Sequence, residues 1–240
     1  MSIWIALWLL VSIALIYFSA WTSIILLKQR RTWEDFAKKN KLRFQTGTLL
    51  APPKMDGAYK GYDISLFPSE HQTADSRGLR KLTAIEMMMH SDMPFEGAIG
   101  TGGMVQLIQE LDFKDEMRPQ ENWWNPAHII KTDAGAKMEA YLVPERLKIL
   151  MSLSKIKNVW LIFIFRGDTT ILRVDTADAL ETPAKLEKLL SAMLETAKKL
   201  ELAEGEGARL KGIKAAKAGS KAKKLEAPED AGGGLQLEDE

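Results

Sequence analysis

Residues 159–174 read VWLIFIFRGDTTILRV, and this stretch decides the fold. Its first seven residues are all apolar, which predicts a buried strand at the centre of a sheet. Gly167-Asp168 fits a two-residue hairpin turn, so residues 170–174 are expected to return as the neighbouring antiparallel strand. Arg166-Gly167-Asp168 also spells an adhesion tripeptide, but a turn is needed at this position, and we interpret it as one.

An amphipathic helix is predicted after this hairpin. Pro183 opens it, and its apolar residues recur at helical spacing on one face, namely Leu186, Leu189, Leu190, Met193, Leu194, Ala197 and Leu200. We expect this face to cover the sheet. Upstream of the hairpin, residues 136–156 predict one or two further helices, with Pro144 at a helix start.

The first half of the chain predicts mainly strands. These are expected at 42–45, 62–67 and 79–89, and a further strand is expected at 127–131. Residues 93–126 are irregular and read as a long connection, with one short helix near 105–111. The succession of elements predicts an α+β fold: a mostly antiparallel sheet with helices packed on one face.

Three consecutive methionines, Met87-Met88-Met89, lie in one of the predicted strands. Adjacent residues of a strand face opposite ways, so Met88 is expected to point away from its two neighbours. Both faces of the sheet would then be apolar at this point, which indicates a second covering layer or a partner surface. Packing in the core is the interpretation that we favour.

The N-terminal segment, residues 1–27, contains no Lys, Arg, Asp, Glu or His. As a helix it measures roughly 40 Å, against a hydrocarbon core of about 30 Å. The alternative is a cleaved signal peptide, which requires a basic start, a shorter apolar run and small residues before the cleavage site. Because Phe18-Ser19-Ala20 places a bulky ring where a small residue belongs, we predict an uncleaved transmembrane anchor.

A basic collar follows the anchor, formed by Lys28, Arg30 and Arg31. The positive-inside rule then predicts a single-pass protein of the cell (inner) membrane, with its N-terminus outside and its C-terminal domain cytoplasmic. The three collar residues are candidate contacts to the lipid surface. Helical spacing of Trp33 and Phe36 predicts that the membrane helix continues to Asn40-Lys41.

Three serines form a narrow stripe on the predicted membrane helix. At about 100° per residue, Ser12, Ser19 and Ser23 fall within roughly 40° of each other, which would let another membrane helix approach closely. The stripe therefore predicts a membrane protein partner or self-association. In the alternative interpretation, which we favour, each serine bonds back to a carbonyl of its own helix.

The composition changes at about Gly205 to Gly, Ala, Lys and Glu, with almost no large apolar residues, which predicts a disordered tail. Residues 208–225 of this tail are basic and residues 226–240 are acidic. The basic part would either lie on an anionic leaflet or remain solvated, and we favour the solvated tail. The predicted organisation is an anchor with basic collar (1–31), an α+β domain (32–204) and a charged tail (205–240).

Composition excludes several classes of function. The 240-residue chain has 33 basic and 32 acidic side chains, a net charge of +1, so it lacks the positive excess that nucleic acid binding requires. It has no cysteine, which excludes disulfides, thiolate nucleophiles and cysteine-ligated metals. No nucleic acid partner is therefore predicted.

The remaining motifs indicate no cofactor and no metal. The glycine-rich run 97–103 has neither the Walker nor the dinucleotide-binding spacing, and we interpret it as a flexible turn. The three histidines lack metal-binding spacing, and the run 71–75, which begins with His71, reads as a polar loop. No serine lies in a Gly-x-Ser-x-Gly motif, so no hydrolase is indicated.

Trp123-Trp124 stands beside Asn125-Pro126 in the long connection. Two adjacent aromatic side chains in a loop are candidate partner-binding residues, because they can dock to lipid or protein. The alternative is a loop tucked over the domain.

Several short motifs are spread over residues 28–200. They are Trp33-x-x-Phe36-Ala37, Leu42-Arg43-Phe44, Gly57-x-Tyr59-x-Gly61-Tyr62-x-Ile64-x-Leu66 and Ala140-Tyr141-Leu142-Val143-Pro144-Glu145-Arg146. Together with the anchor and collar, they resemble those of bacterial single-pass membrane proteins that carry an uncharacterised cytoplasmic α+β domain. The resemblance implies location and fold. Because those families have no established catalytic residues, it implies no catalytic residue here.

We weigh three functions. The leading hypothesis is a non-enzymatic, membrane-anchored accessory, assembly or scaffold protein that acts through protein–protein contacts. The alternative is a membrane-tethered domain that binds a lipid head group or a small ligand. An enzyme is the least favoured, because the sequence offers no catalytic constellation.

Overall fold

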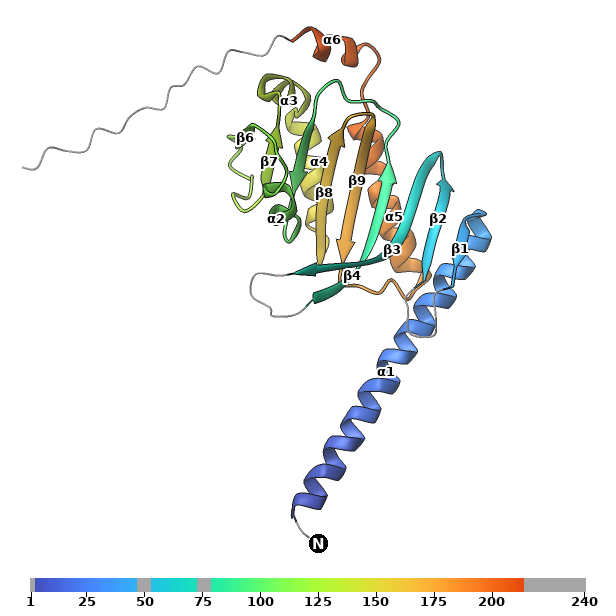
Figure 1. Ribbon diagram of the computed structural model, residues 1–240. Coiled ribbons are helices and arrows are strands. Elements are labelled where there is room, and N and C mark those ends of the chain that lie inside the picture. The colour runs from blue at the N-terminus through green and yellow to red at the C-terminus, as the bar shows by residue number, and fades with distance from the viewer. Residues whose placement is uncertain (1–2, 47–52, 73–78, 214–240) are drawn as a thin grey trace, which may run out of the picture.

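The computed structural model describes residues 3–46, 53–72 and 79–213 (Figure 1). The helices are α1 (Ile3–Asn40), α2 (Met104–Gln109), α3 (Gly135–Tyr141), α4 (Pro144–Ser154), α5 (Pro183–Leu200) and α6 (Glu206–Gly212). The strands are β1 (Arg43–Gln45), β2 (Lys54–Tyr59), β3 (Tyr62–Gln72), β4 (Leu79–Met88), β5 (Gly97–Gly100), β6 (Asp115–Met117), β7 (Ile129–Thr132), β8 (Val159–Arg166) and β9 (Thr169–Thr176).

The first helix, α1, is long and apolar enough to span a membrane. An 18-residue window of it has a mean hydropathy of 2.3, and none of that window is buried. In Figure 1 this part of α1 projects away from the rest of the molecule. The last turns of α1 bury Trp33, Phe36 and Ala37 in the main core, so the apolar helix and the domain are one continuous unit. The helix ends at Asn40, as predicted.

The nine strands of the described residues form one sheet with the order β1-β2-β3-β4-β9-β8-β5-β7-β6, and every neighbouring pair is antiparallel. The hairpin predicted from residues 159–174 is β8–β9, at the middle of this order. It joins the meander β1–β4 on one side to β5, β7 and β6 on the other. The α+β prediction with a mostly antiparallel sheet is confirmed.

The two faces of the sheet differ because side chains alternate along each strand. One face packs Phe163, Leu172 and Val174 into the main core, together with buried residues of α1, α3, α4, α5 and α6. In Figure 1, α4 and α5 run behind the sheet. On the other face α2 forms a smaller core with Ala98 and Ile162. Helices therefore pack on both faces, whereas the sequence predicted one.

The longest domain helix, α5, follows its predicted pattern. Pro183 is at its start, and the side chain of Thr182 accepts a hydrogen bond from the backbone N–H of Lys185 at 3.4 Å. This is the usual way to satisfy a free N–H in the first helical turn. All seven apolar residues of the predicted stripe are buried, so the expectation that this face covers the sheet is confirmed.

The glycine-rich run 97–103 is not a flexible turn, because its first four residues form the buried strand β5. A Cβ atom on Gly97 would lie 2.4 Å from Cε of Met138, and one on Gly100 would lie 2.4 Å from Cδ1 of Ile108. These glycines let neighbouring side chains pack closely against the strand. The connection predicted at 93–126 contains β5, α2 and β6.

The C-terminal boundary also differs from the prediction. The sequence predicts a disordered tail from residue 205, but the structure has α6 at Glu206–Gly212, and Leu210 of this helix is buried in the main core. The rest of the predicted tail, 214–240, lies outside the described residues.

Candidate functional site

The sheet face on which α2 packs also carries a cluster of polar and charged side chains, which we call the open-face network. It consists of Ser69 and His71 on β3, Glu86 on β4, and Arg173 and Asp175 on β9. Antiparallel register places Glu86 directly opposite Arg173. We call the surface over β3, β4 and β9 on this side the open face, because α2 packs mainly against β5, β7 and β8.

Asp175 is the centre of the network and is fully buried. Its Oδ2 atom accepts from Ser69 Oγ at 2.5 Å and contacts His71 Nε2 at 2.6 Å. Arg173 donates from Nε to Oδ1 at 2.6 Å and from Nη2 to Oδ2 at 2.9 Å. Burial alone raises the pKa of Asp175, but the bonds and charge of Arg173, with the bonds from Ser69 and His71, outweigh burial and lower this pKa. Asp175 is therefore ionised at neutral pH.

Arg173 is shared between two carboxylates. Besides Asp175, its Nη1 donates to Glu86 Oε1 at 3.0 Å. The guanidinium carbon lies 5.4 Å from the centroid of the Phe67 ring, within the range of a cation–π contact. These partners hold the positive charge in one orientation, because guanidinium and carboxylate match as planar groups.

Trp160 on β8 borders the network and links it to the smaller core. Its ring meets the ring of His71 edge-to-face, with centroids 5.5 Å apart, and the Arg80 guanidinium lies 5.2 Å from it. Two glycines make room for the indole, since a Cβ atom on Gly102 or Gly103 would lie 2.4 Å from a ring carbon. Gly102 also has φ +57°, which favours glycine.

The network contains Ser, His and Asp but does not have the arrangement of a catalytic triad. In a triad the imidazole lies between the hydroxyl and the carboxylate and takes the proton of the hydroxyl. Here Ser69 and His71 both contact the same Asp175 oxygen. The hydroxyl of Ser69 donates to the carboxylate, and the side chain is buried. The geometry therefore holds these charges in place and does not place His71 to take the proton of Ser69.

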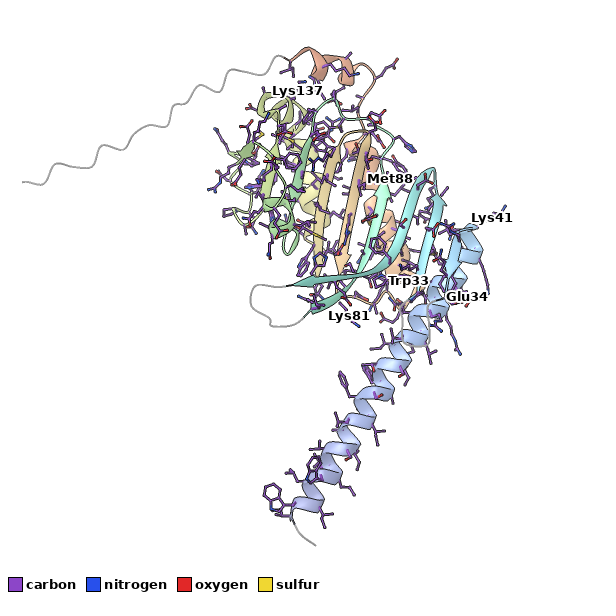
Figure 2. All side chains as sticks on the ribbon, viewed as in Figure 1. Trp33, Glu34, Lys41, Lys81, Met88 and Lys137 are labelled. Atoms are coloured by element: carbon purple, nitrogen blue, oxygen red, sulfur yellow. The ribbon has the colours of Figure 1, made fainter. Side chains whose placement is uncertain are left out.

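Apolar side chains surround the network on the open face. Met88 is 39% exposed, and its cross-strand partner Ile171 is half-buried, as is Phe67. Met87 and Met89 are buried in the main core, so the predicted alternation is confirmed. The favoured interpretation, that Met88 packs in the core, is wrong. Figure 2 labels Met88 on the sheet.

The serine stripe lies along the exposed part of α1, away from the open face. Ser23 Oγ donates to the backbone oxygen of Ser19 at 2.9 Å, as in the alternative interpretation of the stripe. Ser12 is exposed on the same helix. Of the collar, Lys28 and Arg31 are exposed, and Arg30 is half-buried.

The two tryptophans of the pair differ in exposure: one packs against the domain and the other lies at the surface. Trp124 packs partly buried against the main core and meets His128 edge-to-face, with ring centroids 5.6 Å apart. Trp123 is 39% exposed. Only Trp123 is thus placed at the surface as a partner-binding residue would be.

A groove of about 1060 Å³ lies between α4, the end of α5 and α6. Arg146 lines it and donates to both carboxylate oxygens of Glu206, at 2.7 and 2.6 Å. The same guanidinium donates to the backbone oxygens of Tyr141 and Glu201 and lies 4.3 Å from the Tyr141 ring. Arg146 therefore serves to hold α6 on the domain.

Sequence reasoning missed the open-face network. The sequence predicts His71 in a polar loop, whereas it lies within β3 and faces Asp175. A signal was present, because Ser69-x-His71 and Arg173-x-Asp175 repeat polar residues at the two-residue period of a strand. Bringing the two pairs together required the pairing of β3, β4 and β9.

In the part of the chain that the structure describes, no group of three or more His, Asp or Glu residues is placed to hold a metal ion. Comparison with known proteins finds no family model that matches the chain and no significantly similar curated protein.

Proposed function

We propose that this protein is a non-enzymatic, membrane-anchored accessory or scaffold protein whose α+β domain binds a protein partner through the open face. In this proposal α1 crosses the inner membrane of a bacterial cell, and the collar and domain lie on the cytoplasmic side. The observation that carries the proposal is the open face itself, in which exposed and half-buried apolar side chains surround charges that are already fixed.

The composition of the open face supports a protein partner. Interfaces are enriched in Met, aromatic residues and Arg at their centre, and Met88, Phe67 and Arg173 supply these types. Arg173 and Asp175 are oriented before any partner arrives, so binding would cost little side-chain entropy at these positions. Their alternating charges would select a partner of complementary pattern.

The coverage of the sheet supports the same conclusion. Buried residues of five helices share the main core with one face, whereas on the other face α2 packs mainly against β5, β7 and β8. Met88 and Ile171 are neighbours on the uncovered side. Apolar side chains next to each other on an uncovered sheet are typical of a surface that another chain covers.

Photo-crosslinking tests the proposal in native membranes. A photoreactive amino acid replaces Met88 in the full chain, and the matched control replaces Glu195, which is exposed on α5 on the other side of the sheet. We expect one discrete adduct from position 88 and none of that mass from position 195. Adding Ile171→Arg should abolish the adduct, because a guanidinium would replace the apolar neighbour.

The mass of the adduct distinguishes self-association from binding to a different protein. An adduct of twice the chain mass would mean self-association, and any other discrete mass would mean a different protein. The proposal fails if position 88 gives no adduct, or if positions 88 and 195 give the same set of products.

A further inference from the structure

A second cavity lies where α1 leaves the domain. It has a volume of about 290 Å³ and is formed by α1, β3, β4 and the loop after β9. We call it the juxtamembrane pocket; the lining residues that matter here are Leu26, Gln29, Trp33, Glu70, Lys81 and Thr83. Ligand pockets begin at about 300 Å³, so this volume suits a small polar group. Figure 2 shows Trp33 and Lys81 at this end of the domain.

The position of the pocket along α1 places it at the level of lipid head groups. The charge-free part of the chain ends at Leu27, next to the pocket residue Leu26. At about 1.5 Å per residue, Trp33 lies roughly 10 Å farther along the helix than Leu26. The polar layer on each side of the hydrocarbon is about 5–7 Å thick, so the pocket extends across it. This step rests on the membrane anchoring contained in the proposed function.

The indole of Trp33 has an unused hydrogen-bond donor. The side chain is 1% exposed, and its Nε1–H has no acceptor among the residues that the structure describes. About 90% or more of buried polar groups in proteins are hydrogen-bonded, so this donor calls for a partner. Trp33 lines the pocket, but its Nε1 atom is itself buried, so an oxygen atom of a bound molecule reaches this donor when the indole shifts outward.

Two opposite charges line the same pocket. Glu70 on β3 and Lys81 on β4 are directly opposite each other in the antiparallel register, and both are exposed. Neither side chain takes part in an ion pair within the described ranges. A carboxylate and an ammonium side by side, neither in an ion pair with another described residue, match a molecule that carries both charges.

We propose that the juxtamembrane pocket binds the head group of a phospholipid that carries a phosphodiester and a primary ammonium, as phosphatidylethanolamine does. Lys81 and the Trp33 indole N–H bind oxygens of the phosphodiester. Glu70 accepts hydrogen bonds from the ammonium. A quaternary ammonium has no N–H to donate, so the pocket discriminates against phosphatidylcholine.

Native mass spectrometry of the full chain tests this assignment. The protein is purified in mild detergent and mixed with equal amounts of phosphatidylethanolamine, phosphatidylcholine and phosphatidylglycerol. We expect one retained phosphatidylethanolamine per chain, favoured about tenfold over the other two, which corresponds to one additional charge-assisted interaction.

Two variants, with one control, separate the roles of the pocket residues. Lys81→Gln should lower retention of phosphatidylethanolamine about tenfold, because the phosphodiester loses its cation. Glu70→Gln should remove the preference over phosphatidylcholine. The matched control is Lys137→Gln, at the opposite end of the domain in Figure 2, which should retain lipid as the wild-type chain does.

A spectroscopic readout addresses Trp33 itself. In the ¹⁵N-labelled chain, the indole N–H signal that Trp33→Phe removes should move downfield in the proton dimension when phosphatidylethanolamine is added. The signal should not move in the Lys81→Gln chain. Lys81 and Glu70 are exposed strand residues, so their variants keep the assignment testable if Trp33→Phe fails to fold.

Four results would overturn the assignment. The first two are equal retention of all three lipids by the wild-type chain and an equal loss of retention in Lys81→Gln and Lys137→Gln. The third is an indole signal that does not move when phosphatidylethanolamine is added. The fourth is binding of inorganic phosphate or glycerophosphoethanolamine as tight as that of the lipid. Failure of the proposed membrane anchoring is distinguishable from failure of lipid binding, because alkaline extraction would then release the protein from membranes. Failure of the partner contact is also separate, because Met88 lies outside the pocket.

Discussion

Replacing Asp175 by Asn tests whether the open-face network stabilises the fold. The substitution keeps the size of the side chain but removes its charge and one acceptor oxygen. Asp175 accepts from Ser69, His71 and Arg173, and all four contacts are 2.5–2.9 Å long. The amide NH₂ would face donors on one side, and Arg173 would keep one bond to the amide oxygen and its ion pair with Glu86 but lose the charge of Asp175.

The expected loss is about 3 kcal/mol in the free energy of unfolding. Removing one partner of a buried pair costs about 3–5 kcal/mol. We take the lower end because the Arg173 side chain is 20% exposed and retains Glu86 as a counter-charge. For a domain of about 150–250 residues, 3 kcal/mol corresponds to a fall of roughly 6–12 °C in Tm.

Urea unfolding of the full chain in non-ionic detergent, followed by tryptophan fluorescence, measures this loss. The matched control is Asp168→Asn in the β8–β9 turn, where the side chain is exposed, and its expected effect is within about 0.5 kcal/mol. A loss below about 1 kcal/mol for Asp175→Asn, or equal losses for both variants, would refute the reasoning.

The same variant makes a prediction about pH. The pKa of Asp175 is lowered in the folded protein, so its contribution is fully present above the unfolded value of about 3.9. The contribution is lost as the pH falls through the lower folded value. The stability difference between wild type and Asp175→Asn should therefore be constant from about pH 5 to 7 and shrink below about pH 4. A difference that grows on acidification would contradict this assignment.

Two further substitutions test packing. Gly102→Ala should destabilise the domain by more than about 1 kcal/mol, because φ is +57° and the new Cβ would lie 2.4 Å from the Trp160 ring. Gly212→Ala, with nothing within 4 Å, should leave the urea midpoint nearly unchanged, and similar shifts for the two would argue against the close approach. Leu190→Ala should cost about 2–5 kcal/mol, since Leu190 is fully buried on α5. The exposed Lys188→Ala should cost less than about 0.5 kcal/mol in the same assay, and a larger cost would contradict the assigned orientation of α5.

The central and C-terminal parts of the fold were predictable because their signals are local. Seven apolar residues before Gly167-Asp168 specify a central strand and its turn without reference to the rest of the chain. The stripe on α5 is equally local, since a helix repeats every 3.6 residues. Pro144 marks the start of α4 for the same reason, because proline fits the first helical turn.

Other elements depend on contacts between distant residues. The strand β2, which has Gly57 at φ +142°, shows little periodicity of its own and is held between β1 and β3. The strand β5 reads as a glycine-rich turn because the side chains that surround it come from α2, α3 and β8. The sequence predicts a disordered tail at α6 because the residue that holds this helix, Arg146, is 60 residues away from its partner Glu206.

The candidate site was hidden for the same physical reason. His71 and Asp175 are 104 residues apart, and only the pairing of β3 with β4 and of β4 with β9 brings them into contact. The individual residues look ordinary in the sequence. Their significance arises from a register that side-chain types alone do not specify.

The β3–β4 hairpin connects the two proposed surfaces, because its alternating residues point to opposite sides. In β3, Ser69 and His71 face the open face, whereas Glu70 lines the juxtamembrane pocket. In β4, Glu86 belongs to the network and Lys81 to the pocket. A shift of one residue in the register would exchange the two sets. Both surfaces therefore depend on one strand pairing, and a head group held between α1 and this hairpin would also fix the open face relative to the bilayer.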